Sequence, residues 1–525
     1  MTDGRFADSF VIATAVKFKG EAVAIEIVYP FDFPDEAPTV FGPPDLLDRH
    51  QHSTSGNFCL LENSDADWWP GWPAAHLVTN TLTKLLGDTE QGRDAVTAGE
   101  ADMPEPVSAH IAYGSGAVLV PDPFWEFELD VVHGDIKLVQ GARDEQLVLT
   151  EAQGVGAIDP ELHERLVGQK AKQHRGVWVA LAESPPPASS GPDLLRLVDE
   201  AVPESLDRLR RVLRSEKKRR AIESWLGVSF PEEGPQRGQV RRAWVFLRVA
   251  LGRDGTKSVQ RTVRVQALSP AERLRRLPEL SGLDDASVAV IGAGSLGSPV
   301  ALELAKAGVG RVAVGDWDTF DVNNAVRHAV GVSWAGIAKT VAVASEAQAR
   351  NPFIEVTPLH LHVGAGQGDS DRLDSLLESV DLVVDTTGSL AVARILNRRC
   401  REAGKRLVIA GLSAGSFGGE VIVLRPDGPC FMCFALAQRE GTIPVPSEGP
   451  RSNVTPVGCA HPAFSGAGFD ATELAAVVAR AATQATYMTS YPALDYDWSI
   501  INFRGAPRWQ HGLLERHPEC PVCQT

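Results

Sequence analysis

The chain has 525 residues, of which 44% are hydrophobic and 22% are charged, and this length suits about three globular domains. With 51 basic and 67 acidic residues it carries a net charge of −16, which argues against a general affinity for nucleic acid phosphates but would suit a basic protein partner. No stretch approaches the roughly 20 apolar residues of a membrane span, and the N-terminal residues lack the order of a signal peptide. Seven cysteines are too few for a disulfide scaffold. We therefore expect a cytoplasmic protein that binds neither membranes nor nucleic acid.

Residues 1–100 are predicted to form a small α+β domain. Alternating apolar residues indicate strands at 10–16 and 22–28. The proline-rich run 29–38 cannot be helical, whereas residues 74–86 carry apolar side chains at helical spacing.

Residues 105–270 are predicted to form a second α+β region. Strand-like segments at 117–120, 177–182 and 243–250 alternate with charged helical stretches such as 206–224. This region contains no motif that carries chemistry and no internal repeat, so the sequence leaves its role open.

Residues 271–525 follow a strand–helix–strand pattern. A buried strand at 288–291 precedes a helix at 298–307 and a strand at 311–315, and further strands follow at 382–384 and 406–410. This alternation predicts a Rossmann-like α/β domain, with a parallel sheet covered on both faces.

A glycine turn joins the first strand and helix of this domain. Gly292, Gly294 and Gly297 would let the backbone turn tightly and approach phosphate oxygens at a helix N-terminus. Asp316 closes the next strand, where a ribose hydroxyl would be held. These features alone fit NAD as well as ATP, and the plainer alternative is a purely structural turn.

A spaced polar set follows the second strand: Asp316, Asp318, Asn324, Arg327 and Lys339. This set resembles the ubiquitin-activating superfamily of ThiF/MoeB-like adenylyltransferases, which includes bacterial enzymes that activate sulfur-carrier proteins. The resemblance implies that ATP binds here with Mg²⁺. Arg327 and Lys339 would offset charge on the phosphates, Asn324 would orient a phosphate and Asp316 would bind the ribose.

Two details bear on this resemblance. The family carries an Asp-x-x-Asp stretch for magnesium, but this chain reads Asp385-Thr-Thr-Gly388, so either Asp385 serves alone or the metal is held differently. Arg273 and Arg276 take the place of an arginine pair that precedes the first strand in the family and often reaches into the partner subunit, so the resemblance implies that they bind the nucleotide.

Two CxxC pairs, Cys430 with Cys433 and Cys520 with Cys523, predict a structural zinc site. Four thiolates leave no open position for catalysis, so this zinc would tie the C-terminal tail to the domain. The same superfamily carries such a clip in the same order. The alternative is four unligated thiols.

Cys459 lies between the two zinc pairs, before a predicted helix at 471–485. The resemblance implies that it is the nucleophile that forms a thioester, with His461 either assisting it or capping the next turn. The alternative is a small buried cysteine, which is how we interpret Cys400.

Cys59 stands in a second pattern, made of Tyr29-Pro30, Phe33-Pro34, Gly56-Asn-Phe-Cys59-Leu60 and Trp69-Pro70. This pattern resembles the core of the ubiquitin-conjugating enzymes and implies that Cys59 accepts an acyl group. The family's histidine-proline-asparagine motif is missing, which leaves His50, His52 or Asn57 as the oxyanion donor. The alternative is a structural proline and tryptophan cluster around a buried cysteine.

The two resemblances together imply a fusion of an activating and a conjugating enzyme, of the kind found in bacterial anti-phage (CBASS-type) operons. Its partners would be a protein with an activatable C-terminus, either a nucleotidyltransferase or a ubiquitin-like protein, and a lysine-bearing acceptor. The superfamily also implies a homodimer. Three other interpretations stay open: a sulfur-carrier adenylyltransferase without conjugation, an NAD-dependent oxidoreductase, and a decayed adenylation fold that acts as a scaffold.

Overall fold

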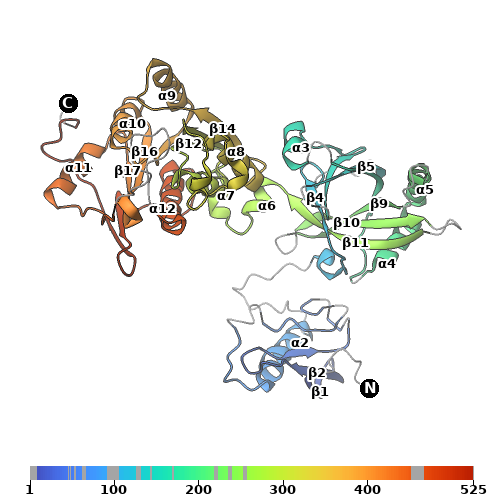
Figure 1. The fold of residues 1–525 in the computed structure, drawn as a ribbon. Helices are drawn as coiled ribbons and strands as arrows, with labels where there is room; N and C mark the ends of the chain where they lie inside the picture. Colours follow the sequence, from blue (N-terminus) through green and yellow to red (C-terminus); the bar gives the residue numbers. More distant parts are fainter. Residues whose placement is uncertain are drawn as a thin grey trace. The chain divides into compact units, whose positions relative to one another are not determined.

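The computed structural model describes residues 9–44, 46–47, 49–52, 55–61, 67–90, 106–125, 132–141, 143, 145–167, 171–187, 189–217, 223–234, 239–251, 257–450 and 466–523. The chain divides into two compact units, Met1–Leu268 and Ser269–Thr525 (Figure 1). No helix among these residues is long and apolar enough to cross a membrane.

The first unit begins with a three-stranded antiparallel sheet in the order β1 (Phe10–Phe18), β2 (Glu21–Tyr29) and β3 (Thr39–Phe41). The predicted strands at 10–16 and 22–28 lie within β1 and β2. The predicted helix at 74–86 is observed later in the chain, as the π-helix η2 (Leu77–Leu82) continued by α2 (Thr83–Glu90). Leu77 and Leu82 are buried in the same core as Ile25 and Val40 of the sheet.

The middle of the chain forms a closed β-barrel with two helices against its outer face. Its strands follow the order β4-β11-β10-β9-β8-β5-β6-β7, and β4 also pairs with β6, so the sheet closes on itself. The strands are β4 (Ala117–Pro121), β5 (His133–Gln140), β6 (Gln146–Ala152), β7 (Gly156–Ala157), β8 (Gln173–Ala180), β9 (Glu223–Glu233), β10 (Val240–Leu251) and β11 (Lys257–Leu268).

Successive residues of the barrel strands enter two different cores. Trp178 and Trp244 belong to one core, while Val177 and Val245 belong to another with residues of the helices α4 (Gly191–Ala201) and α5 (Pro203–Lys217). The other helices are η3 (Val107–His110) and α3 (Pro160–Leu166). The helix predicted over 206–224 is observed as α5, which ends at Lys217. The prediction is too long at its C-terminal end, because Glu223 already begins β9.

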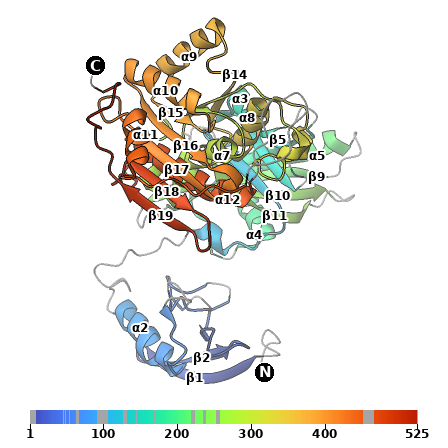
Figure 2. The same ribbon diagram turned by 60° about the vertical axis from the view of Figure 1, so that its left-hand side comes forward.

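The second unit contains an eight-stranded sheet in the order β14-β13-β12-β15-β16-β17-β18-β19. The pairs from β14 to β16 are parallel, and those from β16 to β19 are antiparallel. The strands are β12 (Ser287–Ile291), β13 (Arg311–Asp316), β14 (Glu355–His360), β15 (Leu382–Asp385), β16 (Arg406–Leu412), β17 (Gly418–Leu424), β18 (Trp498–Asn502) and β19 (Arg508–Gly512). Figure 2 shows β15 to β19 side by side.

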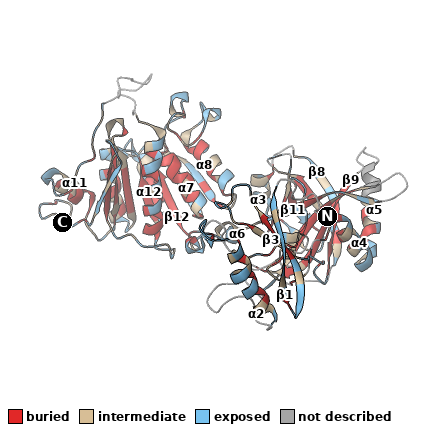
Figure 3. Ribbon diagram, turned by 90° about the horizontal axis from the view of Figure 1, so that it is seen from below, coloured by how far each residue is buried: buried red, intermediate tan, exposed pale blue. Residues whose placement is uncertain are grey.

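Helices cover both faces of this sheet, which confirms the predicted Rossmann-like architecture. One face packs against α7 (Gly297–Ala307), α8 (Lys339–Arg350) and α12 (Gly468–Thr486). The other packs against α9 (Gln367–Ser379), α10 (Leu390–Glu402) and α11 (Phe431–Glu440). Figure 3 shows buried residues along β12, α7 and α12. The short elements are α6 (Pro270–Leu274), η4 (Pro278–Leu280), η5 (Val322–Asn324), η6 (Val332–Trp334) and η7 (Ala414–Ser416).

The strand order reverses beside β12. The chain runs from β12 outward to β13 and β14, and then returns to place β15 on the other side of β12. In open α/β sheets, ligands bind outside the carboxyl ends of the strands at such a switch point. Ile291, Asp316 and Asp385 end the three strands that border it.

Candidate functional site

The glycine turn after β12 is tightly packed at two of its three glycines. Gly292 has a φ of +94°, and a Cβ on Gly297 would lie 1.7 Å from the Gly292 oxygen and 2.4 Å from Thr386 Oγ1. A Cβ on Gly294, in contrast, would meet nothing within 4 Å. Gly292 and Gly297 therefore shape the turn, whereas Gly294 faces open space at the start of α7.

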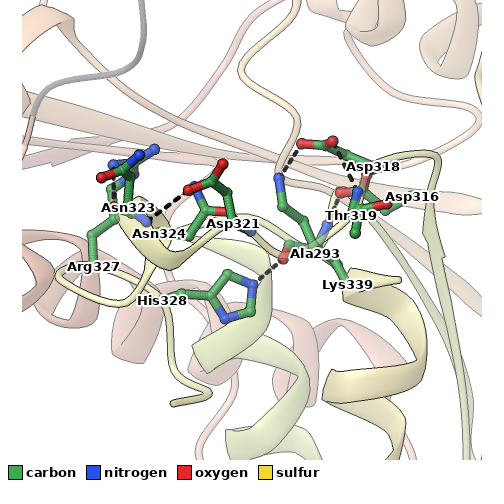
Figure 4. A network of polar contacts seen from close by, with 10 residues as sticks. All are labelled: Ala293, Asp316, Asp318, Thr319, Asp321, Asn323, Asn324, Arg327, His328 and Lys339. Carbon is green, nitrogen blue, oxygen red and sulfur yellow. Dashed lines mark hydrogen bonds and ion pairs between the residues drawn. The ribbon is translucent and has the colours of Figure 1, made fainter. Parts of the chain in front are cut away.

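Asp316 connects the turn to the segment that follows β13. Its carboxylate accepts hydrogen bonds from Ala293 N at 2.7 Å and from Asp318 N at 2.8 Å (Figure 4). Each carboxylate oxygen has a second lone pair, so Asp316 can still accept a ribose hydroxyl. Asp318 forms an ion pair with Lys339, the first residue of α8.

The segment before Arg327 is fixed by a capping box. Asp321 accepts from Asn323 N at 2.8 Å, and Asn324 Oδ1 accepts from Asp321 N at 3.0 Å, which leaves the Asn324 amide nitrogen to donate. The half-buried Arg327 donates to the Asn323 carbonyl at 3.4 Å. Burial lowers the pKa of Arg327, and the nearby Asp321 opposes this shift.

His328 is 8% exposed and lies between Arg327 and Lys339 in Figure 4. Its Nε2 is 2.6 Å from the Ala293 carbonyl oxygen, and its Nδ1 is 3.2 Å from Val330 N. Burial lowers the pKa of His328 to about 4. The imidazole is therefore neutral at physiological pH.

Asp385, which ends β15, is 1% exposed. It accepts from Thr387 N at 3.0 Å and from Thr387 Oγ1 at 2.7 Å, and burial raises its pKa to about 6. Gly388 has a φ of +67°, and a Cβ there would meet nothing within 4 Å. One carboxylate with phosphate oxygens is a ligand set that Mg²⁺ commonly uses, so Asp385 fits such an ion without a second aspartate.

The first arginines of the predicted set lie elsewhere in the unit. Arg273 donates to the Lys306 carbonyl at 3.3 Å, in the last turn of α7, and burial lowers its pKa. Arg276 is exposed. The 11 residues of α7 span about 16 Å, so Arg273 lies at the far end of this helix from the glycine turn.

The four paired cysteines come together as expected. Their Sγ atoms lie within 4.8 Å of one another, with Cys430 3.5 Å from Cys520 and Cys433 3.6 Å from Cys523. Tetrahedral zinc with Zn–S bonds of about 2.3 Å would place the sulfurs about 3.8 Å apart. The cluster therefore matches a four-thiolate zinc site that joins α11 to the C-terminal tail.

Cys59 is exposed, which excludes the buried alternative. Its N–H donates to the His50 carbonyl at 2.8 Å, and His52 N donates to the Asn57 carbonyl at 2.8 Å, so all three candidate oxyanion donors lie in the hairpin that carries Cys59. Gln51 anchors this hairpin, because its buried amide donates to the Pro43 and Gly56 carbonyls and accepts from Leu47 N. Asn57 Oδ1 is buried without a hydrogen-bond partner among the described residues.

Cys459 and His461 lie outside the described residues, but the flanks of their segment are anchored. Gly449 N donates to the Ala414 carbonyl at 2.7 Å, in the loop after β16. A Cβ on Gly468 would lie 2.9 Å from the Val326 oxygen, next to Arg327. Cys400 is 1% exposed and burial raises its pKa to about 12, consistent with a structural role.

Three residues at this site received no role from the sequence: His328, Ser298 and Thr386. Thr386 Oγ1 lies 3.0 Å and 2.8 Å from the Ile291 and Gly292 oxygens, and Ser298 Oγ accepts from Ala329 N at 3.1 Å. The sequence offered one signal for them: each directly follows a predicted site residue, with Thr386 after Asp385, His328 after Arg327 and Ser298 after Gly297. Their contacts are with backbone groups of distant segments, which no local pattern reveals.

Comparisons with known proteins match the part of the chain that carries this site. Residues 268–509 match the model of the ThiF family. The SAMP-activating enzyme E1 of Haloferax volcanii is 29% identical over 47% of this chain and 83% of its own length. The adenylyltransferase and sulfurtransferase MOCS3 of Anopheles gambiae is 37% identical over 29% of this chain. The match covers about a third (33%) of the length of MOCS3.

At least two relatives match nearly the whole chain. Uncharacterized protein y4oA of Sinorhizobium fredii (strain NBRC 101917 / NGR234) is 27% identical over 92% of this chain and 86% of its own length. Among solved structures, the crystal structure of E. coli MccB with ATP is 19% identical, covers 47% of this chain and 68% of its own, and has a TM-score of 0.35.

Proposed function

We propose that the ThiF-family domain within residues 268–509 uses ATP to activate the C-terminal carboxylate of a partner protein as an acyl-adenylate. The observation that carries this proposal is the meeting of the glycine turn, Asp316, Lys339 and Asp385 around the switch point of the sheet. The ThiF match over the same residues supports it.

In this reaction a carboxylate oxygen attacks the α-phosphorus of ATP, the bond from that phosphorus to the bridging oxygen breaks, and pyrophosphate leaves. The N-terminus of α7 and the side chains of Arg327 and Lys339 would offset the charge on the phosphates. Lys339 forms an ion pair with Asp318, and on ATP binding it would exchange this carboxylate for a phosphate oxygen.

Two metal ions would serve this domain. Asp385 would hold Mg²⁺, which neutralises charge on the phosphates when bound. Cys430, Cys433, Cys520 and Cys523 would hold a structural Zn²⁺. Arg273 and Arg276 would bind a nucleotide only in the active site of a partner subunit. Their role in this proposal therefore requires a homodimer.

We further propose that the acyl group passes to two cysteines. The Cys459 thiolate would attack the acyl-adenylate and release AMP, and the Cys59 thiolate would then displace Cys459 from the thioester. A lysine amine of the acceptor would finally displace Cys59 and form an isopeptide bond. The exposure of Cys59 and the anchored flanks of the Cys459 segment support this sequence. The carboxyl donor would be a nucleotidyltransferase or a ubiquitin-like protein, and the setting would be anti-phage defence.

Exchange of labelled pyrophosphate into ATP tests the first step. We expect exchange in the full-length protein only when MgATP and the correct carboxyl donor are both present, and we expect Lys339→Ala to abolish it. Absence of both MgATP binding and exchange with every candidate donor would support a decayed scaffold instead.

Gels without reductant test the transfer steps. Cys459→Ala should keep pyrophosphate exchange but lose every thioester, whereas Cys59→Ala should keep the adduct on Cys459 and lose the final conjugate. Cys400→Ala is the matched control. If Cys59→Ala conjugated normally, the conjugating role of Cys59 would be wrong. If the parent protein catalysed pyrophosphate exchange but formed no adduct on Cys59 and no conjugate, the domain would instead be a sulfur-carrier adenylyltransferase, a possibility favoured by the likeness to MOCS3.

A further inference from the structure

His328 contacts the glycine turn, although it lies 35 positions from Ala293 in the chain. Val330 N–H donates to Nδ1, so Nδ1 is the acceptor nitrogen and the neutral ring carries its proton on Nε2. Nε2 then donates to the Ala293 carbonyl at 2.6 Å. Phe320 packs edge-on against the ring at 5.1 Å, which restricts its rotation.

Both ends of Ala293 are therefore held by side chains. Its N–H donates to Asp316, and its carbonyl accepts from His328. The Ala293 carbonyl and the Gly294 N–H belong to one trans peptide, in which the two groups point in opposite directions. A carbonyl fixed toward buried His328 consequently directs Gly294 N–H to the opposite side of this peptide. Gly294 itself is not crowded, since a Cβ built on it would meet nothing within 4 Å.

The hydrogen bond between His328 and Ala293 also links the glycine turn to the segment that follows Arg327. Ala329 N donates to Ser298 Oγ in the first turn of α7 at 3.1 Å, so residues 328–330 are bonded to both the turn and the helix. Arg327 directly precedes this bonded segment. The backbone of Arg327 is therefore held next to a segment that is bonded to the glycine turn.

We propose that His328 is a positioning residue for the nucleotide, whose Nε2–H holds the Ala293 carbonyl so that Gly294 N–H and Arg327 meet the phosphates together. This inference rests on the proposed use of ATP and names a residue to which the proposed chemistry gives no role. The neutral imidazole does not contact the reacting atoms. It acts through the peptide that it orients.

Two amide variants separate this positioning from general structural support. In His328→Gln the amide nitrogen can take the place of Nε2 and donate to Ala293. In His328→Asn the shorter amide can accept from Val330 N–H at the place of Nδ1 but offers no donor to Ala293. His328→Ala removes both contacts.

Isothermal titration of the full-length variants with MgATP and with adenosine provides the test. Loss of the hydrogen bond to Ala293 should weaken MgATP binding about tenfold in His328→Ala and His328→Asn, while His328→Gln should stay within about threefold of the parent. Adenosine, which lacks phosphates, should bind all four proteins equally.

Other results of these titrations would contradict the positioning role of His328. Parent-like MgATP affinity in His328→Asn, a loss in His328→Gln as large as in His328→Ala, or a parallel loss of adenosine binding would overturn the positioning role. If the parent protein bound no MgATP at all, the proposed function itself would fail, and this inference with it.

Discussion

The surroundings of Asp385 strongly affect the ionisation of its carboxyl group. The folded protein buries its carboxyl group almost completely, and among the described residues only Thr387 donates hydrogen bonds to it. Desolvation disfavours the charged form and outweighs these bonds, so the pKa rises to about 6. Under the proposed function, a Mg²⁺ ion bound with the nucleotide would place a positive charge next to this carboxylate and so favour its charged form.

This raised pKa predicts a pH-dependent cost in stability. A carboxyl group whose folded pKa exceeds its unfolded pKa contributes stability below the unfolded value, and this contribution is lost as the pH rises through about 6. In EDTA, Asp385→Asn should therefore gain on the parent by about 1–3 kcal/mol between pH 4 and pH 8. Urea denaturation at both pH values measures this change. A difference that stays constant with pH would contradict it.

At the scale of single residues, the sequence predicts best where spacing alone carries the chemistry. Asp316 and Lys339 are linked through Asp318, as their spacing suggested. The four paired cysteines form a separate cluster, also as their spacing suggested. Thr386 and His328 could not be identified in this way, because each binds main-chain oxygens of a segment far away in the sequence. The role of Arg273 stays a prediction, because its guanidinium binds the far end of α7 within one chain and the resemblance implies a nucleotide site in the partner subunit.

Among the elements, the connection from β12 to α7 should be the least tolerant of substitution. Gly297→Ala would drive its methyl group into the Gly292 oxygen and Thr386 Oγ1, and we expect a destabilisation of about 2 kcal/mol or more. Gly294→Ala is the matched control: it should change the free energy of unfolding by less than about 1 kcal/mol, because its methyl group meets open space.

Denaturant titration of both variants provides the measurement. Binding of MgATP adds a second readout, because the methyl group of Gly294→Ala would point into the space left for phosphates. We therefore expect weaker binding in a variant of parent-like stability. Equal stability of the two variants would show that the close approach at Gly297 can relax.

The elements of the second unit follow from local patterns, because strands buried on both faces read as continuous apolar runs between amphipathic helices. The barrel of the first unit could not be predicted in this way. Its closure pairs β4 with β11, so Ala117 lies beside Arg264. Pairing between segments so far apart depends on the whole fold, and the alternating burial of single strands does not specify it.

For the whole molecule, the C-terminal part of the second unit should be held by contacts other than the chain between residues 450 and 466. β17 pairs with β18, α12 shares a core with β12 and α7, and the cysteine cluster joins α11 to the tail. His517 Nε2 also lies 2.9 Å from a carboxylate oxygen of Glu440.

A protease site inserted between residues 451 and 465 tests this expectation. After cleavage the two pieces should elute together in native buffer with zinc. Cys520→Ser, or a chelator, should let them separate at a lower urea concentration than the cleaved parent, whereas Cys400→Ala should not. Separation of the cleaved parent in native buffer would contradict the prediction.

The anchoring of both flanks also matters for how such a chain can diversify. Gly449 is tied to the loop after β16, and Gly468 lies against the backbone beside Arg327, so both ends of the intervening stretch are fixed by the domain itself. Related chains could therefore exchange that stretch as a cassette, changing its length and sequence without rebuilding the sheet. Under the proposed function, such an exchange would have to keep Cys459, which lies in that stretch.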